Sequence, residues 1–177
     1  AEIRGNKSSE VSVLDVGAGT GELTARVARE LDGRRAYVVG ADSSEHAVNA
    51  IADKGIQGVQ CDALQLPFAD KSFDYVFSTL FLHHLRDDAA VKLIREMLRV
   101  SQRKIFVIDL ERRPLAYIFY RAFGRLFFQP FTRDDGALSI LRAFNPSELR
   151  NIAKLAEMKN IRIRRSHLNR LILSGTN

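Results

Sequence analysis

Short apolar runs of strand length alternate with segments of helical periodicity along most of this 177-residue chain. In the first helical segment, Leu23, Val27 and Leu31 recur at intervals of about one helical turn. The pattern predicts strands near residues 11–16, 36–41, 57–61, 72–79 and 104–110, and helices near residues 20–31, 44–53, 88–100, 114–128 and 146–157. This alternation is typical of a parallel sheet with helices on both faces.

The C-terminal part departs from this alternation. Residues 161–165 and 170–173 have the pattern of two strands with no helix between them, so one of the two must run antiparallel. Upstream, Asn145, Pro146 and Glu148 form the capping-box pattern of a helix start. We therefore predict an α/β fold with a mostly parallel sheet, an antiparallel C-terminal hairpin strand and helices on both faces.

Three glycines at alternate positions follow the first strand. Gly17, Gly19 and Gly21 predict a turn with positive φ angles, which glycine adopts without steric cost. With the strand and the next helix, this turn predicts a cradle whose free backbone N–H groups point at a polar ligand. Dinucleotide-binding turns have the spacing G-x-G-x-x-G, whereas the sixth residue here is Glu22. Glu22 suits an ammonium group or no ligand, and Asp15 also favours a cationic group over a phosphate.

Four segments in order along the chain resemble the motifs of the class I S-adenosylmethionine-dependent methyltransferases. They are residues 13–21 (VLDVGAGTG), 38–42 (VVGAD), 60–68 (QCDALQLPF) and 73–85 (FDYVFSTLFLHHL). The resemblance implies a Rossmann-like methyltransferase sheet with S-adenosyl-L-methionine as the cofactor. The implied cofactor-binding residues are Asp15, Gly17, Ala18, Gly19, Gly21, Asp42, Ser43, Asp62, Ala63, Ser78 and Thr79.

Two acidic residues at predicted strand ends have chemistry that suits this cofactor. Asp42 lies 21 residues after Gly21, where a carboxylate can accept two hydrogen bonds from a ribose diol. The carboxylate of Asp62 can accept from an adenine amino group, while the Ala63 N–H can donate to a ring nitrogen. The structural alternative for each aspartate is a helix N-cap or a turn residue.

His83 and His84 follow the fourth predicted strand, where substrates meet in open α/β sheets. A histidine there can take a proton from a phenol or hydroxyl, and we expect His83, which is nearer the strand end, to be the catalytic residue. The alternative is that the pair starts the next helix or covers the cofactor. Methyl transfer from a sulfonium requires no metal ion, and we expect none.

The acceptor is expected to be a small apolar or phenolic molecule, methylated on oxygen or carbon. Residues 114–131 are rich in Phe and Tyr, and the long connection at residues 132–144 adds Arg133 and Arg142. These segments either wall an apolar acceptor pocket or pack as an ordinary helix and loop. Residues 132–149 also resemble methyltransferases that act on quinone precursors and polyketide phenols.

Composition limits the other partners. Residues 1–88 carry a net charge of −5 and residues 89–177 a net charge of +11. A basic half can bind nucleic acid or an anionic membrane surface, but the basic residues are scattered and favour a solvated face. Ser78-Thr-Leu-Phe also differs from the Asn/Asp-Pro-Pro-Tyr sequence of base-modifying enzymes. Peripheral membrane contact stays open, and the oligomeric state is not predicted.

The remaining expectations concern the whole chain. The length fits one domain over residues 1–177, and the lone Cys61 fits a reducing cytoplasm. Members of this family usually carry helices before the first motif, and only ten residues precede Val11, so we expect a short or missing lid. The competing functions are a nicotinamide-dependent oxidoreductase, a nucleic-acid methyltransferase and a non-catalytic protein that keeps the fold.

Overall fold

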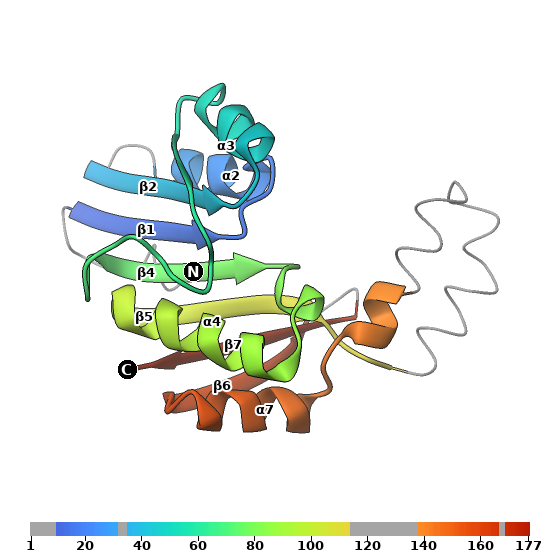
Figure 1. The fold of residues 1–177 in the computed structure, drawn as a ribbon. Helices are drawn as coiled ribbons and strands as arrows, with labels where there is room; N and C mark the ends of the chain where they lie inside the picture. The colour runs from blue at the N-terminus through green and yellow to red at the C-terminus, as the bar shows by residue number, and fades with distance from the viewer. Residues whose placement is uncertain (1–9, 32–34, 114–137, 167–168) are drawn as a thin grey trace.

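A computed structural model describes residues 10–31, 35–113, 138–166 and 169–177. Its centre is a seven-stranded sheet with the order β3-β2-β1-β4-β5-β7-β6 (Figure 1). The strands are β1 (Glu10–Val16), β2 (Arg35–Asp42), β3 (Gln57–Gln60), β4 (Phe73–Thr79), β5 (Ser101–Leu110), β6 (Lys159–Ser166) and β7 (Arg170–Thr176). The first five strands are parallel, and β7 pairs antiparallel with both β5 and β6. The predicted sheet and its antiparallel C-terminal hairpin are therefore confirmed.

Helices cover both faces of this sheet. They are α2 (Glu22–Glu30), α3 (Glu45–Ala52), the one-turn 3₁₀ helix η1 (Leu82–His84), α4 (Asp87–Val100) and α7 (Pro146–Leu155). Figure 1 shows α4 and α7 along one side of the sheet, whereas α2 and α3 lie together near β2. The apolar side of α2 packs with Val13, Val38 and Tyr75 on the second face.

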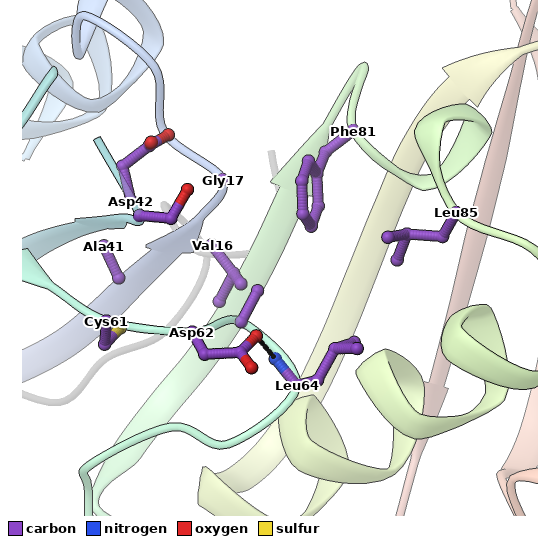
Figure 2. A pocket seen from close by; sticks show the side chains of 11 residues that line it. Val16, Gly17, Ala41, Asp42, Cys61, Asp62, Leu64, Phe81 and Leu85 are labelled. Carbon is purple, nitrogen blue, oxygen red and sulfur yellow. Dashed lines mark hydrogen bonds between the residues drawn. The ribbon is translucent and has the colours of Figure 1, made fainter.

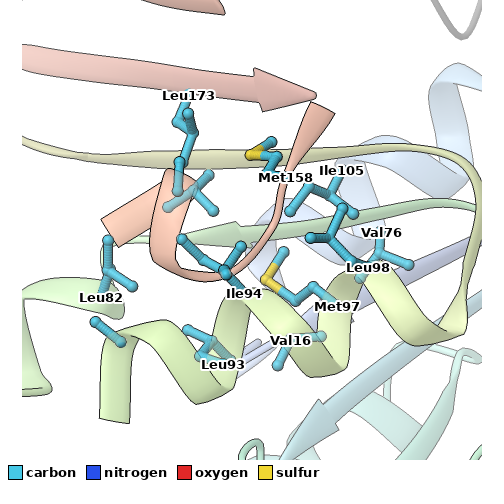
Figure 3. Packing of buried hydrophobic residues seen from close by; sticks show 14 of the residues in the cluster. Val16, Val76, Leu82, Leu93, Ile94, Met97, Leu98, Ile105, Met158 and Leu173 are labelled. Atoms are coloured by element: carbon cyan, nitrogen blue, oxygen red, sulfur yellow. The ribbon is translucent and has the colours of Figure 1, made fainter. Parts of the chain in front are cut away.

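The larger core lies between the sheet and the α4–α7 layer (Figure 3). In α4, Leu93, Ile94 and Met97 are fully buried, and their spacing of three or four residues places them on one face of the helix. They meet strand residues such as Ile105 and Leu173, which are also fully buried. This packing holds the carboxyl ends of β4 and β5 in fixed positions beside η1.

Local signals in the sequence predicted most element boundaries to within a few residues. The capping box is confirmed, because Asn145 accepts from the Glu148 N–H while the Glu148 carboxylate accepts from the Asn145 N–H. The expected loop at residues 132–144 is wrong in its last part, because residues 138–142 are helical. The predicted aromatic helix at residues 114–128 lies outside the described residues. No helix in the described ranges has the length and apolar character needed to cross a membrane.

Candidate active site

The glycine turn after β1 has the predicted backbone shape. The φ angles of Gly17, Gly19 and Gly21 are 69°, 53° and 77°. A Cβ on Gly17 would lie 2.6 Å from the Phe81 ring, and a Cβ on Gly21 would lie 2.6 Å from Ile51 of α3. Gly21 therefore lets α2 and α3 pack closely, whereas Gly17 lets an aromatic ring approach the end of β1.

The expectation of free N–H donors in this turn is wrong. The Gly17 and Ala18 N–H groups both donate to the Ala41 carbonyl, at 2.9 and 3.0 Å. The Gly19 N–H donates to the Asp42 carboxylate at 2.8 Å, and the Gly21 N–H donates to the Ala18 carbonyl. The turn thus spends these donors on its own shape, and its contribution to a ligand is space beside the strand ends.

Asp15 and Glu22 both have protein partners. The Asp15 carboxylate is buried and accepts a 2.6 Å hydrogen bond from the Thr24 hydroxyl at the start of α2. Burial raises the pKa of Asp15 to about 7, opposed by the Thr24 hydrogen bond and helped by the charge of Asp42. Exposed Glu22 forms a 3.2 Å ion pair with Lys54. Asp15 therefore faces the first turn of α2, and Glu22 fits the expectation that it meets no ligand.

A pocket of about 470 Å³, partly open to solvent, lies at the carboxyl ends of β1, β2 and β3. We call it the Asp42 pocket. It is lined by Val16, Gly17, Ala41, Asp42, Ser43, Cys61, Asp62, Ala63, Leu64, Phe81 and Leu85. Figure 2 shows Asp42 and Cys61 on one side, with Phe81 and Leu85 facing them from the other. Its volume is within the usual range for small-molecule sites.

The two predicted aspartates meet in this pocket. Asp42 accepts from the Gly19 N–H with one oxygen and from the Ser44 N–H, at 3.0 Å, with the other. Asp62 accepts from the Leu64 N–H at 2.8 Å, as a turn-forming aspartate does. A carboxylate has about four acceptor sites, so each aspartate keeps capacity for hydroxyl or amino donors of a ligand.

The charge of the Asp42 pocket selects the kind of ligand. Its lining, as far as the structure describes the chain, includes Asp42 and Asp62 but no Lys, Arg or His. Two carboxylates with no cation disfavour a pyrophosphate and favour a ligand with a positive charge. The sequence argument against a dinucleotide, made from Glu22, therefore reaches the same conclusion through different residues.

The sequence did not point to three wall residues of this pocket. Cys61 directly follows β3 and lines the pocket, although its pattern suggested only a small buried apolar residue. Burial, with a smaller effect of Asp62 and Asp42, raises the pKa of the Cys61 thiol, which keeps it neutral. Phe81 and Leu85 come from the segment around η1. A side chain that lines a pocket and one that fills a core look alike in an apolar pattern.

Ser78 and Thr79, predicted to contact the cofactor, lie at the end of β4 and do not line the Asp42 pocket. The hydroxyl oxygens of both are buried and have no hydrogen-bond partner among the described residues. Ser43 and Ala63 do line the pocket, whereas the Ala18 side chain lies close to Gly40. The structure thus gathers part of the predicted set and places the rest behind it.

His83 lies in η1 and is buried, with its ring held by Asp109 of β5. The Nδ1 atom of His83 is 2.6 Å from Asp109 Oδ1, and the His83 backbone N–H donates to Oδ2 at 3.1 Å. His83 does not line the Asp42 pocket. The expectation that only one histidine faces the reaction region also differs from the structure, because His83 and His84 line one hollow with ring centroids 4.1 Å apart.

We call this hollow the His83 pocket. It has about 990 Å³ of open volume and is lined by His83, His84, Leu85, Arg86, Asp87, Arg112, Arg142, Phe144 and Glu148. Arg112 forms an ion pair with Glu148, and Arg86 is 3.9 Å from Asp88. Leu85 lines both pockets, so the segment around η1 stands between them. Within the described ranges, no three His, Cys, Asp or Glu side chains gather as a metal site requires.

Comparison with known proteins gives a consistent family match. A family model described as "Methyltransferase domain" matches residues 13–104. The chain is 38% identical over 109 residues to the ubiquinone/menaquinone biosynthesis C-methyltransferase UbiE of Idiomarina loihiensis. That match covers 57% of this chain and 42% of the relative, so the chain spans less than half of that protein's length.

Solved structures share the fold at low sequence identity. A SAM-dependent methyltransferase from Aquifex aeolicus has a TM-score of 0.69 and 19% identity, covering 98% of this chain and 85% of that one. The structure of PigF with SAH has a TM-score of 0.70 and 16% identity, covering 99% of this chain and 53% of that one. At these identities the similarity establishes a common architecture.

Proposed function

The chain belongs to the methyltransferase domain family, and from this premise we propose that it transfers a methyl group from S-adenosyl-L-methionine to a small acceptor molecule. The observation that carries the proposal is the Asp42 pocket. Its two carboxylates, its apolar walls and its lack of cationic lining among the described residues match a cofactor that has an adenosine and a positive charge.

The residues of the pocket fit the parts of this cofactor. Asp42 is suited to the ribose diol and Asp62 to the adenine amino group, because both keep free acceptor capacity. Val16, Leu64 and Phe81 offer apolar contact to the flat base. When bound, the cofactor supplies an electrophilic methyl group on a sulfonium sulfur. The protein therefore mainly has to orient the two reactants and exclude water.

We place the acceptor in the His83 pocket. It lies at the carboxyl ends of β4 and β5 and shares Leu85 with the Asp42 pocket, so an acceptor there would be adjacent to the cofactor. His83 is buried in its wall and can serve as the base that removes a proton from the acceptor. The UbiE relative, a quinone-biosynthesis C-methyltransferase by name, supports a phenolic acceptor that is methylated on carbon or oxygen.

Three further points belong to this proposal. We propose that residues 1–177 form one domain, supported by a single sheet that runs from β1 to β7. We propose a cytoplasmic location, supported by one free cysteine, Cys61. We propose a small molecule and not a nucleic acid as the partner, because His83 and its neighbours form a closed hollow and not an aromatic stacking platform.

Isothermal titration with S-adenosylmethionine and, separately, with NAD tests the proposal. The wild-type chain should bind the first and not the second. Asp42→Ala should lose about 1–3 kcal/mol of binding free energy, because the ribose donors lose their acceptor. Asp53→Ala changes an exposed aspartate at the far end of α3 and is the matched control, with affinity unchanged. Binding of NAD without S-adenosylmethionine would contradict the proposed function.

A further inference from the structure

The carboxylate of Asp109 is enclosed by donors from two elements. It is 3% exposed and accepts from the His83 backbone N–H at 3.1 Å and from the Leu110 N–H at 2.6 Å. Its third contact is His83 Nδ1, at 2.6 Å. Asp109 comes from β5, 26 residues after His83, so the contact exists only because β4 and β5 are parallel neighbours.

These contacts determine where the proton of the His83 ring lies. An ionised carboxylate can only accept hydrogen bonds, and two backbone N–H groups already donate to Asp109. His83 Nδ1 must therefore be the donor in the short contact with Asp109, which leaves Nε2 without a proton in the neutral ring. Nε2 has no hydrogen-bond partner among the described residues, and His83 lines the His83 pocket.

We propose that Asp109 is a positioning residue that locks His83 in the Nδ1–H tautomer and presents Nε2 as a base to the acceptor. This inference rests on the proposed function and specifies the acceptor class, because a base in this position serves an acceptor that must lose a proton. Phenols, enols and other acidic O–H or C–H groups belong to this class. Tertiary amines and thioethers, which accept a methyl group without losing a proton, do not.

The proton and electron balance of this step is complete. The acceptor O–H or C–H bond breaks, and its proton moves to His83 Nε2. The electron pair left on the acceptor forms the new bond to the methyl carbon, while the carbon–sulfur bond breaks and its pair stays on the neutral thioether. The positive charge lost by sulfur thus reappears on the imidazolium, beside the Asp109 carboxylate that stabilises it.

The other charged groups around His83 are further from this role. Those that line the same hollow are His84, Arg86, Asp87, Arg112, Arg142 and Glu148. Of the two acidic side chains among them, Glu148 pairs with Arg112 and Asp87 lies in the first turn of α4. In the described part of the chain, Asp109 is thus the carboxylate that contacts the His83 ring.

Long-range ¹H–¹⁵N correlation NMR of the ¹⁵N-histidine-labelled protein tests this assignment without any acceptor. The chain has four histidines, so loss of one signal set in His83→Gln assigns the ring. We expect the proton on Nδ1 and a bare Nε2 in the wild type. Asp109→Asn should give a mixture of tautomers or the Nε2–H form, because an amide can donate to Nδ1 as well as accept from it.

A matched control separates positioning from a general structural effect. Asp74 is also a strand aspartate that accepts from a backbone N–H, that of Ser12, but it lies at the opposite end of β4. Asp74→Asn should leave the His83 tautomer unchanged. A wild-type His83 with its proton on Nε2 would overturn the inference, as would a folded Asp109→Asn with an unchanged tautomer. Titration with S-adenosylmethionine separately decides the proposed function, so the two failures are distinguishable.

Discussion

Asp15 makes the stability of this fold depend on pH, and Asp15→Asn is the change that reveals it. The Asp15 carboxylate is 2% exposed, and burial raises its pKa from 3.8 to about 7. In the unfolded chain the same group titrates near its ordinary value. Between these two pH values the folded state holds a proton that the unfolded state has released, so stability must fall as the pH rises.

The size of the effect follows from the two pKa values. Each pKa unit corresponds to 1.36 kcal/mol, so the difference between 3.8 and about 7 amounts to about 4 kcal/mol at most. This stability is fully present below about pH 4 and is lost progressively until about pH 7. An asparagine at this position has no charge to bury and can still accept from the Thr24 hydroxyl.

Urea unfolding of wild type and Asp15→Asn, repeated from pH 4 to pH 8, measures the effect. The difference between the two proteins cancels the titration of all other groups. We expect the variant to gain stability relative to wild type as the pH rises, with a plateau above about pH 7. Thr24→Val should extend the pH-dependent range upward, because the Thr24 hydrogen bond lowers the pKa of Asp15. A difference that does not change between pH 4 and pH 7 would refute the reasoning.

Two further predictions concern the pockets. Gly19→Val should weaken S-adenosylmethionine binding by more than about tenfold in titration calorimetry, because a β-branched residue resists a φ of 53° and displaces the N–H that Asp42 accepts. The chain should still unfold cooperatively, since no atom lies within 4 Å of a Cβ at that position. His83→Ala should lower kcat on a phenolic acceptor by roughly 10²-fold with cofactor affinity unchanged, and normal turnover would make the histidine structural.

The sequence alone determined the local elements and the strand-end chemistry. Strands and helices followed from the spacing of apolar residues, and the start of α7 followed from Asn145 and Glu148, because both signals act within one or two turns of chain. The placement of Asp42 and Asp62 in one pocket was also predictable, since carboxyl ends of neighbouring parallel strands meet at the same edge.

Only the tertiary structure decided which of these residues face a ligand. The Gly17 and Ala18 N–H groups turned out to be used by β2, and Asp15 by Thr24, because a pattern states that a donor exists and not where it points. The contact of Asp109 with His83 joins residues far apart in the chain through the β4–β5 pairing. Such contacts depend on strand order and register, which are set by packing across the whole sheet, and no local stretch of sequence encodes them.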